Sequence, residues 1–310
     1  MSDIKLFRMG DVVPEELQGT SVALEKNLQA TFEKHLDVLL GVRFLASEYA
    51  TGKTHSGRID TLGIDENNSP VIIEYKRSLN QNVINQGLFY LDWLLDHRAE
   101  FTLLAMEKLG SEIQDKIEWS SPRLLCIAGN YTRYDEHAVQ QINRNIELLR
   151  YRWYEQGFLL VELVNAVTTV STTDLSETEL NQVEKPGKTA TQYKSVSEFL
   201  AQASPDLSNL YQSLHDFVMA FGDDVQMKVL KLYFAYRRIK NFACVEVHPQ
   251  AGKLLVFVKV DPDSIELVEG FTRDVRNKGH FGTGDLEITL RTPADFEKAQ
   301  PLIVTSYEMS

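Results

Sequence analysis

Hydrophobic and polar positions follow two different periods along the first 170 residues of the chain. Apolar side chains recur every three to four residues over 20–40, 80–108 and 135–148, which predicts three helices. Short apolar runs bounded by turn residues predict strands at 42–50, 57–65, 70–76, 123–129, 148–154 and 157–164. The order α-β-β-β-α-β-α-β-β is typical of an α/β fold, a mixed sheet with flanking helices.

Residues 171–194 interrupt this pattern. They are rich in Thr, Ser and Glu, contain Pro186-Gly187 and show no apolar period, which indicates a linker between a domain at 1–170 and one at 195–310. In the second part, the pattern of apolar residues predicts helical pieces over 195–240, followed by three strands and a last helix. This order indicates a smaller α+β domain.

Composition narrows the class of protein. A chain of 310 residues can bury two hydrophobic cores, and no window is apolar enough to span a membrane. The N-terminus lacks the apolar run of a signal peptide, and Cys126 and Cys244 each stand inside an apolar run, as buried thiols do. These features predict a cytoplasmic protein without membrane partners. The net charge of −12 argues against a sequence-indifferent nucleic-acid coat but permits a local basic groove.

The most informative cluster is Gly57-Arg58-Ile59-Asp60, followed after thirteen residues by Glu74-Tyr75-Lys76. Alternate residues of a strand share a face, so Glu74 and Lys76 project together, and a turn at 66–69 would bring Asp60 opposite them. Two carboxylates and an ammonium group suit Mg²⁺ or Mn²⁺ and the chemistry of phosphate esters. A solvated Glu/Lys pair on an edge strand is the alternative, and the residues alone leave both interpretations open.

The string GRIDTLGID…PVIIEYKRS resembles the PD-(D/E)XK nuclease superfamily, whose D-(x)n-ExK core lies on such a hairpin. The resemblance implies a restriction-endonuclease-like fold, with Asp60 and Glu74 as ligands of Mg²⁺ or Mn²⁺ and Lys76 assisting the nucleophile. Ile59 stands where the motif name has Pro, at a position that varies widely.

Gln86 and Tyr90 lie four residues apart and match the Q-x-x-x-Y motif of the exonuclease-like branch of that superfamily. The resemblance covers residues 20–95 and implies that both side chains contact the active site or the substrate. It also implies a further acidic residue on the preceding helix, for which Glu25 is the candidate and Glu33 the fallback.

Basic side chains near the motif and in the C-terminal part are candidates for binding phosphate. They are Lys53, Arg58, Arg77, Arg237, Arg238, Arg273 and Arg276. His55 is a weaker candidate for a base, and Arg144, Arg150 and Arg152 could extend a basic groove. The alternatives are solvated loop charges and, for the segment KLYFAYRRIK, an amphipathic helix with buried aromatic residues.

These observations favour a metal-dependent nuclease acting on DNA. The alternatives are a nuclease-fold binding or regulatory module without catalysis and, more remotely, a transport-associated accessory protein. The whole chain resembles bacterial proteins that join such a domain to a C-terminal domain of unknown function, some of them labelled predicted transport proteins. The second domain would serve binding or oligomerisation, and a homodimer stays open.

Overall fold

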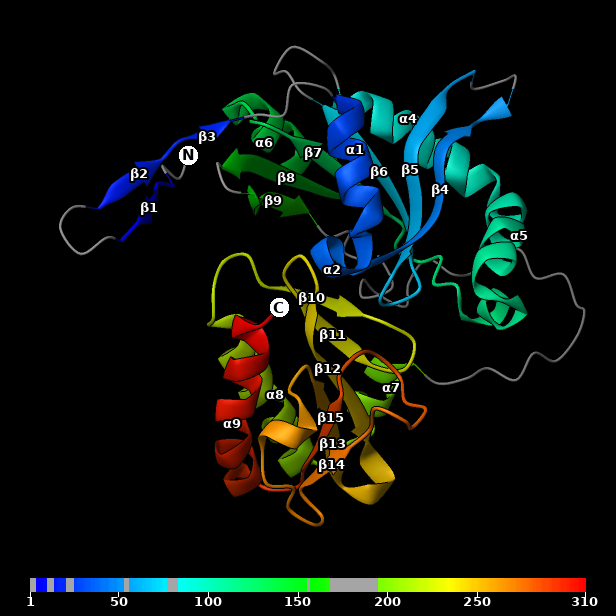
Figure 1. Cartoon of the computed structure of the whole chain (residues 1–310). Helices are drawn as coiled ribbons and strands as arrows, with labels where there is room; N and C mark the ends of the chain where they lie inside the picture. Colours follow the sequence, from blue (N-terminus) through cyan, green and yellow to red (C-terminus); the bar gives the residue numbers. More distant parts are fainter. Residues whose placement is uncertain are drawn as a thin grey trace, which may run out of the picture. The chain divides into compact units, whose positions relative to one another are not determined.

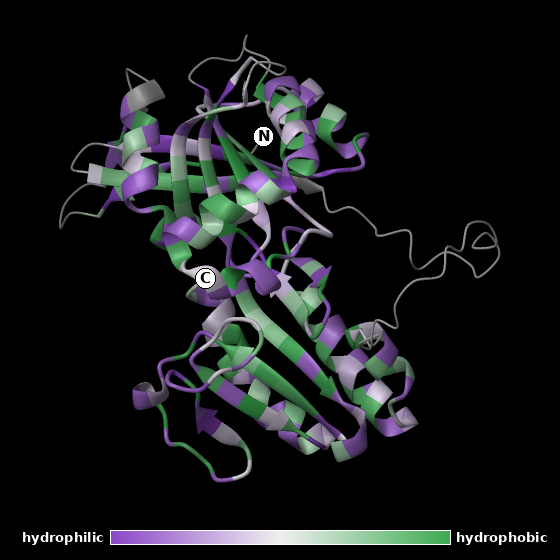
Figure 2. Cartoon of the chain, turned by 90° about the vertical axis from the view of Figure 1, so that its right-hand side faces the viewer, coloured by the Kyte–Doolittle hydropathy of each residue, from purple (hydrophilic) through white to green (hydrophobic). Residues whose placement is uncertain are grey.

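The computed structural model describes residues 4–9, 14–20, 25–52, 56–76, 83–154, 157–167 and 195–310. The chain divides into two compact units, Met1–Thr169 and Val170–Ser310. The predicted linker at 171–194 lies outside the described residues. In each unit the strands carry much of the hydrophobic sequence (Figure 2).

A seven-stranded mixed sheet forms the centre of the N-terminal unit (Figure 1). In spatial order its strands are β3 (Gly19–Thr20), β8 (Asn145–Tyr154), β7 (Arg123–Ala128), β6 (Pro70–Lys76), β5 (Arg58–Asp65) and β4 (Val42–Ala50), and β9 (Phe158–Val167) also pairs with β8. The strands β6, β7 and β8 are parallel, and the other pairs are antiparallel. The predicted mixed sheet and the β5–β6 hairpin are therefore confirmed.

Helices pack on both faces of this sheet. They are α1 (Glu25–Lys34), α2 (Leu36–Leu40), α4 (Val83–Asp96), α5 (Arg98–Leu109), the 3₁₀ helix η1 (Ser111–Lys116) and α6 (Arg133–Gln140). Ile72 shares a core with α4, α5 and α6. Tyr75, on the opposite face of β6, meets Phe32 of α1 with ring centroids 5.8 Å apart. A separate two-stranded hairpin, β1 (Leu6–Arg8) with β2 (Glu15–Leu17), was not predicted.

Three predicted helices are shorter in the structure or are divided into two. The helix predicted at 135–148 ends at Gln140. Residues 141–144 form a turn, and 145–148 belong to β8, because hydrogen bonds to β7 and β9 outweigh the local pattern. The helix predicted at 80–108 breaks at His97, whose ring nitrogen Nδ1 lies 2.8 Å from the Trp93 carbonyl oxygen. The helix predicted at 20–40 breaks at His35, and Thr20 belongs to β3.

A buried ion cluster joins three strands of the N-terminal unit. The guanidinium of Arg123 donates to both carboxylate oxygens of Glu147, over 2.7 and 2.8 Å, and to Asp65 over 3.1 Å. These three side chains are at most 3% exposed. The other oxygen of Asp65 accepts backbone N–H groups of Asn67 and Ser69 in the hairpin turn. Every charge is paired, which such burial requires.

The C-terminal unit is an antiparallel sheet with two long helices on one face (Figure 1). Its strands run in the order β10 (Gln226–Val229), β11 (Phe234–Arg237), β12 (Asn241–His248), β13 (Lys253–Val258), β15 (Leu286–Leu290) and β14 (Thr272–Asp274). The helices are α7 (Val196–Ala201), α8 (Pro205–Met219) and α9 (Pro293–Glu308), with 3₁₀ turns η4 (Pro249–Ala251) and η5 (Pro262–Ser264).

The prediction of a helix at the end of 195–240 is wrong, because this segment forms the hairpin β10–β11. Phe234 and Tyr236 point into the core beneath the helices, whereas Tyr233 and Ala235 pack on the other face of the sheet. This two-residue alternation suits a strand buried on both faces. The aromatic residues are thus buried, but in a strand. No helix in the described ranges is long and apolar enough to cross a membrane.

Replacing Arg123 with Ala should lower the free energy of unfolding of the N-terminal unit by about 3–5 kcal/mol, because Asp65 and Glu147 would stay buried without their cation. Urea denaturation followed by tryptophan fluorescence measures this directly, since all three tryptophans lie in this unit. The control is Lys116→Ala, which removes an exposed partner of Glu112 and should cost under about 1 kcal/mol. Equal losses for the two variants would contradict the role given to Arg123.

Candidate active site

The β5–β6 hairpin brings Asp60 and Glu74 together. The backbone N–H of Asp60 donates to Oε1 of Glu74 over 3.2 Å, and the backbone N–H of Tyr75 donates to Oδ2 of Asp60 over 3.0 Å. Each carboxylate therefore contacts the strand that carries the other one. Lys76 follows on the same face of β6 as Glu74, and its positive charge acts on that carboxyl group. The structure thus assembles all three residues of the motif.

Glu74 is held in an environment that disfavours its charge. The side chain is 0% exposed, and Oε2 is buried without a hydrogen-bond partner among the described residues. Burial first, and the nearby charge of Asp60 second, raise the pKa of Glu74 to about 9. The N–H of Asp60 and the ammonium of Lys76 oppose this rise only in part. A buried carboxyl oxygen without a partner is costly, and a carboxyl group whose pKa is raised this far is a candidate functional group.

The arrangement fits a small divalent cation. Asp60 and Glu74 converge, and the orphaned Oε2 of Glu74 is an oxygen ligand with no protein donor to satisfy it. No cluster of three or more Asp, Glu, His or Cys side chains with metal-binding geometry occurs among the described residues. The chain would thus supply two carboxylates, and water or a phosphate oxygen would complete the coordination, as is usual for Mg²⁺.

Gln86 and Tyr90 of α4 reach the beginning of β5. The hydroxyl of Tyr90 accepts the backbone N–H of Arg58 over 3.1 Å and the side-chain amide of Gln86 over 3.4 Å. A Cβ atom at Gly57 would lie 2.6 Å from the Tyr90 ring, so only glycine permits this approach. The pair therefore holds the strand two residues before Asp60.

Helix α1 contributes a residue that the sequence pattern did not single out. The side-chain amide of Gln29 donates to the Asp60 carbonyl over 2.7 Å and to Ser47 over 3.1 Å. Gln29 is a buried polar residue on a helix face otherwise formed by residues such as Phe32, and this break in the pattern is the signal that could have found it. Glu33 accepts the Thr61 hydroxyl over 2.6 Å, and the Glu25 side chain lies outside the description.

The basic candidates of the N-terminal unit have mixed outcomes. Lys53, His55 and Arg77 lie outside the described residues. Arg58 is exposed and pairs with Glu48 over 2.8 Å. Glu48 has a backbone φ of 52°, which is rare for a residue other than glycine. The negative charge of Glu48 contributes to the raised pKa of Glu74.

Three further arginines lie on or beside β8. Arg144 is exposed in the turn before β8, Arg150 pairs with Glu162 over 2.9 Å, and Arg152 is half-buried. Arg150 is level with Lys76, two strands away, because Ala128 of β7 is in register with both. Of the three, Arg150 is therefore the one at the level of the Asp60–Glu74 site.

The four arginines proposed for phosphate in the C-terminal unit each have acceptors there. Arg237 is buried and donates to the backbone oxygens of residues 238 and 239, and Arg238 pairs with Asp224 over 2.6 Å. Arg273 pairs with Glu287. Arg276 binds Asp263 and Asp274 over 2.7 and 2.8 Å, and its hydrogen bonds lower the pKa of both carboxyl groups. Their binding of phosphate stays a prediction, which these pairings do not favour.

The metal-free protein should lose stability as pH rises because of Glu74. Between its ordinary pKa of 4.5 and the folded value of about 9, the unfolded chain gives up the Glu74 proton while the folded chain keeps it. Each rise in pH then favours unfolding, by up to about 1.4 kcal/mol per unit. Glu74→Gln lacks this proton and should lack the slope.

Urea denaturation in the presence of a chelator, from pH 5 to pH 8 with tryptophan fluorescence as the signal, tests this expectation. The difference between Glu74→Gln and the parent should grow with pH, whereas the exposed control Glu112→Gln should follow the parent. Parallel curves for all three proteins would contradict the raised pKa.

Comparison with known proteins adds a family for the C-terminal part. The chain is 26% identical over 302 residues to an uncharacterized protein of Haemophilus influenzae, covering 97% of this chain and 98% of that protein. Two solved structures are similar to part of the chain: a repair endonuclease from Pyrococcus abyssi (17% identity, TM-score 0.27) and EndoMS in complex with double-stranded DNA (19%, 0.24). Each match covers 42% of this chain and about half of the solved chain, 49% and 47%, and at such TM-scores it carries no argument about activity. Residues 185–310 match the domain of unknown function DUF5655, so the chain carries such a domain at its C-terminal end.

Proposed function

We propose that the N-terminal unit is a metal-dependent nuclease that hydrolyses phosphodiester bonds in DNA. The observation that supports this most is Glu74, which is fully buried with one oxygen unpartnered, opposite Asp60 and beside Lys76. A structural role would leave an uncompensated carboxyl group without a purpose, whereas a cation and its substrate would satisfy it. The resemblance of these residues to the PD-(D/E)XK superfamily points to the same chemistry.

Hydrolysis adds water across a P–O bond and yields a phosphate monoester and an alcohol. Asp60 and Glu74 would hold Mg²⁺ or Mn²⁺, which when bound lowers the pKa of water and neutralises charge on the phosphate. The ammonium of Lys76, on the same strand face as Glu74, would stabilise the attacking hydroxide and the negative charge that develops on the phosphate oxygens. Asp60 is held in place by the Tyr75 N–H and, through its backbone, by Gln29.

Gln86 and Tyr90 would act as positioning residues. Their hydrogen bonds end on each other and on the Arg58 backbone, at the start of the strand that carries Asp60. This arrangement supports the membership of the Q-x-x-x-Y branch that the motif implies. A small displacement of a catalytic strand can lower the rate by about two orders of magnitude.

Asp60→Asn, Glu74→Gln and Lys76→Met should each reduce Mn²⁺- or Mg²⁺-dependent cleavage of labelled DNA at least about a hundredfold, because each removes a group that binds the cation or stabilises charge. The matched controls Glu112→Gln and Lys116→Met change an exposed ion pair on η1 and should cleave like the parent. A panel of single-stranded, duplex and branched DNA with RNA counterparts identifies the substrate.

Titration calorimetry with Mn²⁺ separates this proposal from its alternative. Binding that depends on Asp60 and Glu74 supports the enzyme. If no nucleic acid is cut and no cation binds at these residues, the catalytic proposal fails, and a nuclease-fold binding module takes its place.

Tyr90→Phe should lower kcat about tenfold with less effect on KM, because it removes the acceptor for the Arg58 N–H and loosens the strand before Asp60. Its affinity for Mn²⁺ should stay within the range of the parent, since neither carboxylate is changed. An unchanged kcat would show that the phenol does not position β5.

A further inference from the structure

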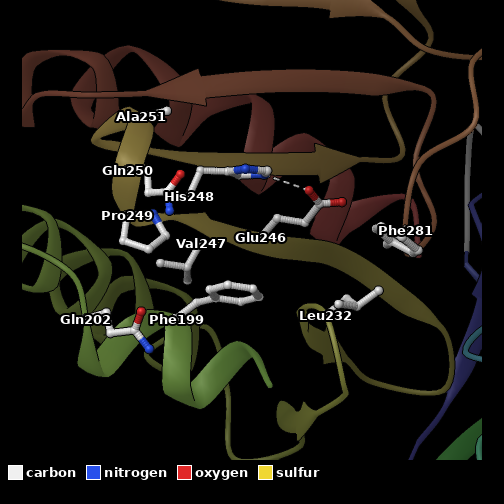
Figure 3. Close-up of a pocket in the computed structure, with 10 residues that line it drawn as sticks. All are labelled: Phe199, Gln202, Leu232, Glu246, Val247, His248, Pro249, Gln250, Ala251 and Phe281. Atoms are coloured by element: carbon white, nitrogen blue, oxygen red, sulfur yellow. Dashed lines mark hydrogen bonds and ion pairs between the residues drawn. The ribbon is translucent and has the colours of Figure 1, made fainter. Parts of the chain in front are cut away.

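A cavity of about 430 Å³ lies within the C-terminal unit, at the end of β12 (Figure 3). It is bordered by α7, by the segment between β10 and β11, by η4 and by the loop before β15. Its volume falls within the range of small-molecule sites. Among the described residues that line it there is no Lys or Arg, so its chemistry does not suit a phosphate group.

Glu246 supplies the carboxylate of the cavity, beside the other polar side chains that line it, Gln202, His248 and Gln250. Its side chain is 11% exposed, and Oε2 lies 2.8 Å from Nε2 of His248. The second oxygen lies on the side away from His248 (Figure 3). The histidine therefore orients the carboxylate, and both carboxylate oxygens keep lone pairs that can accept N–H donors of a ligand.

Aromatic rings stand on two sides of this carboxylate. Phe199 of α7 and Phe281 both line the cavity, on opposite sides of Glu246 in the view of Figure 3, with Leu232 between them. Phe281 is 54% exposed, so its ring is open to a ligand at the mouth of the cavity. An exposed phenyl ring at the mouth of a cavity offers a stacking surface for a flat ligand.

Both neighbours of Phe281 in the chain, His280 and Gly282, pack closely against the sheet. His280 stacks on Phe257 of β13, with ring centroids 4.7 Å apart and planes 12° from parallel. Gly282 has a φ of 83°, and a Cβ atom there would lie 2.6 Å from Cβ of Cys244. The backbone at Phe281 thus lies between two residues that pack against the sheet, which limits the positions open to the ring and lowers the entropy cost of binding.

We propose that this cavity binds a guanine base, either of a free nucleotide or of single-stranded nucleic acid. A flat heteroaromatic ring matches the phenyl rings, and a carboxylate, which only accepts hydrogen bonds, needs adjacent donors. On its Watson–Crick edge guanine presents two neighbouring donors, N1–H and the exocyclic amino group. Adenine and cytosine pair one donor with an acceptor there, and thymine sets one donor between two acceptors. The inference does not rest on the nuclease proposal.

Titration calorimetry of the full chain with a chelator present, so that nothing is cleaved, tests the site. The probes are GMP, IMP, AMP, CMP and UMP, and a single-stranded thymidine octamer with one central guanine or, as the matched control, one hypoxanthine. Guanine should bind at least about tenfold more tightly than hypoxanthine, which lacks only the exocyclic amino group. Binding of GMP identifies a nucleotide site, and binding of the octamer alone identifies a strand site; both support the proposal.

Glu246→Gln and Phe281→Ala should each weaken guanine binding about tenfold or more, through a lost acceptor and a lost stacking surface. Glu287→Gln, on β15, and Phe158→Ala, an equally exposed phenylalanine of the N-terminal unit at 53%, should leave the affinity unchanged. Absence of binding to both GMP and the guanine octamer, equal affinity for all bases, or binding that both pocket variants retain would overturn the proposal. So would preferential binding of arginine amide, whose guanidinium is also flat and rich in donors.

Discussion

The N-terminal unit depends on one buried cation, the guanidinium of Arg123. A charge removed from water must be paired, and Arg123 finds its partners on two other strands, at Asp65 of β5 and Glu147 of β8. Asp65 in turn binds the N–H groups of the hairpin turn. A shift of the β5–β6 hairpin along β7 and β8 would leave these charges unpaired. The cluster therefore helps to set the register of the sheet.

This register has its consequence at the other end of the hairpin. Asp65, near the turn, is fully compensated, whereas Glu74, on the returning strand, faces Asp60 and keeps one oxygen without a partner. The same two strands thus carry Asp65, which stabilises the fold, and Glu74, which destabilises it. A scaffold that is firmly fixed can tolerate such a site, and stability is often lower where ligands bind. The contrast supports a functional role for Glu74 more strongly than its sequence motif does.

The candidate ligand cavity of the C-terminal unit lies at the edge of its regular strand pairing. One face of its sheet is covered by α8 and α9, and the other face is only partly covered, by loops such as the one that carries Phe281. The cavity lies where β12 runs on past the first residue of β11, so that Glu246 is paired with Leu255 of β13 and has no partner in β11. Sheets present binding sites where regular pairing stops, because side chains there are held by the strand and are still accessible.

Features that depend on neighbours close along the chain could be predicted from the sequence. The turn at 66–69, the apolar run that ends in Glu74 and the two-residue spacing to Lys76 are local, so their pattern was enough to predict the hairpin and the grouping of Asp60 with both residues. The two cysteines were likewise predicted to be buried from their apolar neighbours, and both are buried. Local periodicity carries this information because burial repeats with the period of the element.

Features that depend on distant partners could not be predicted in this way, because they arise from contacts between elements. The segment 223–240 became a hairpin because β11 pairs with β12, and Arg238 and Arg273 are paired with carboxylates that no local pattern relates to them. The contact of Gln29 with Asp60 crosses 31 positions of the chain, and the burial of Glu74 needs strands on both sides. Side-chain environment is set by packing between elements, and packing is not encoded in the period of any one of them.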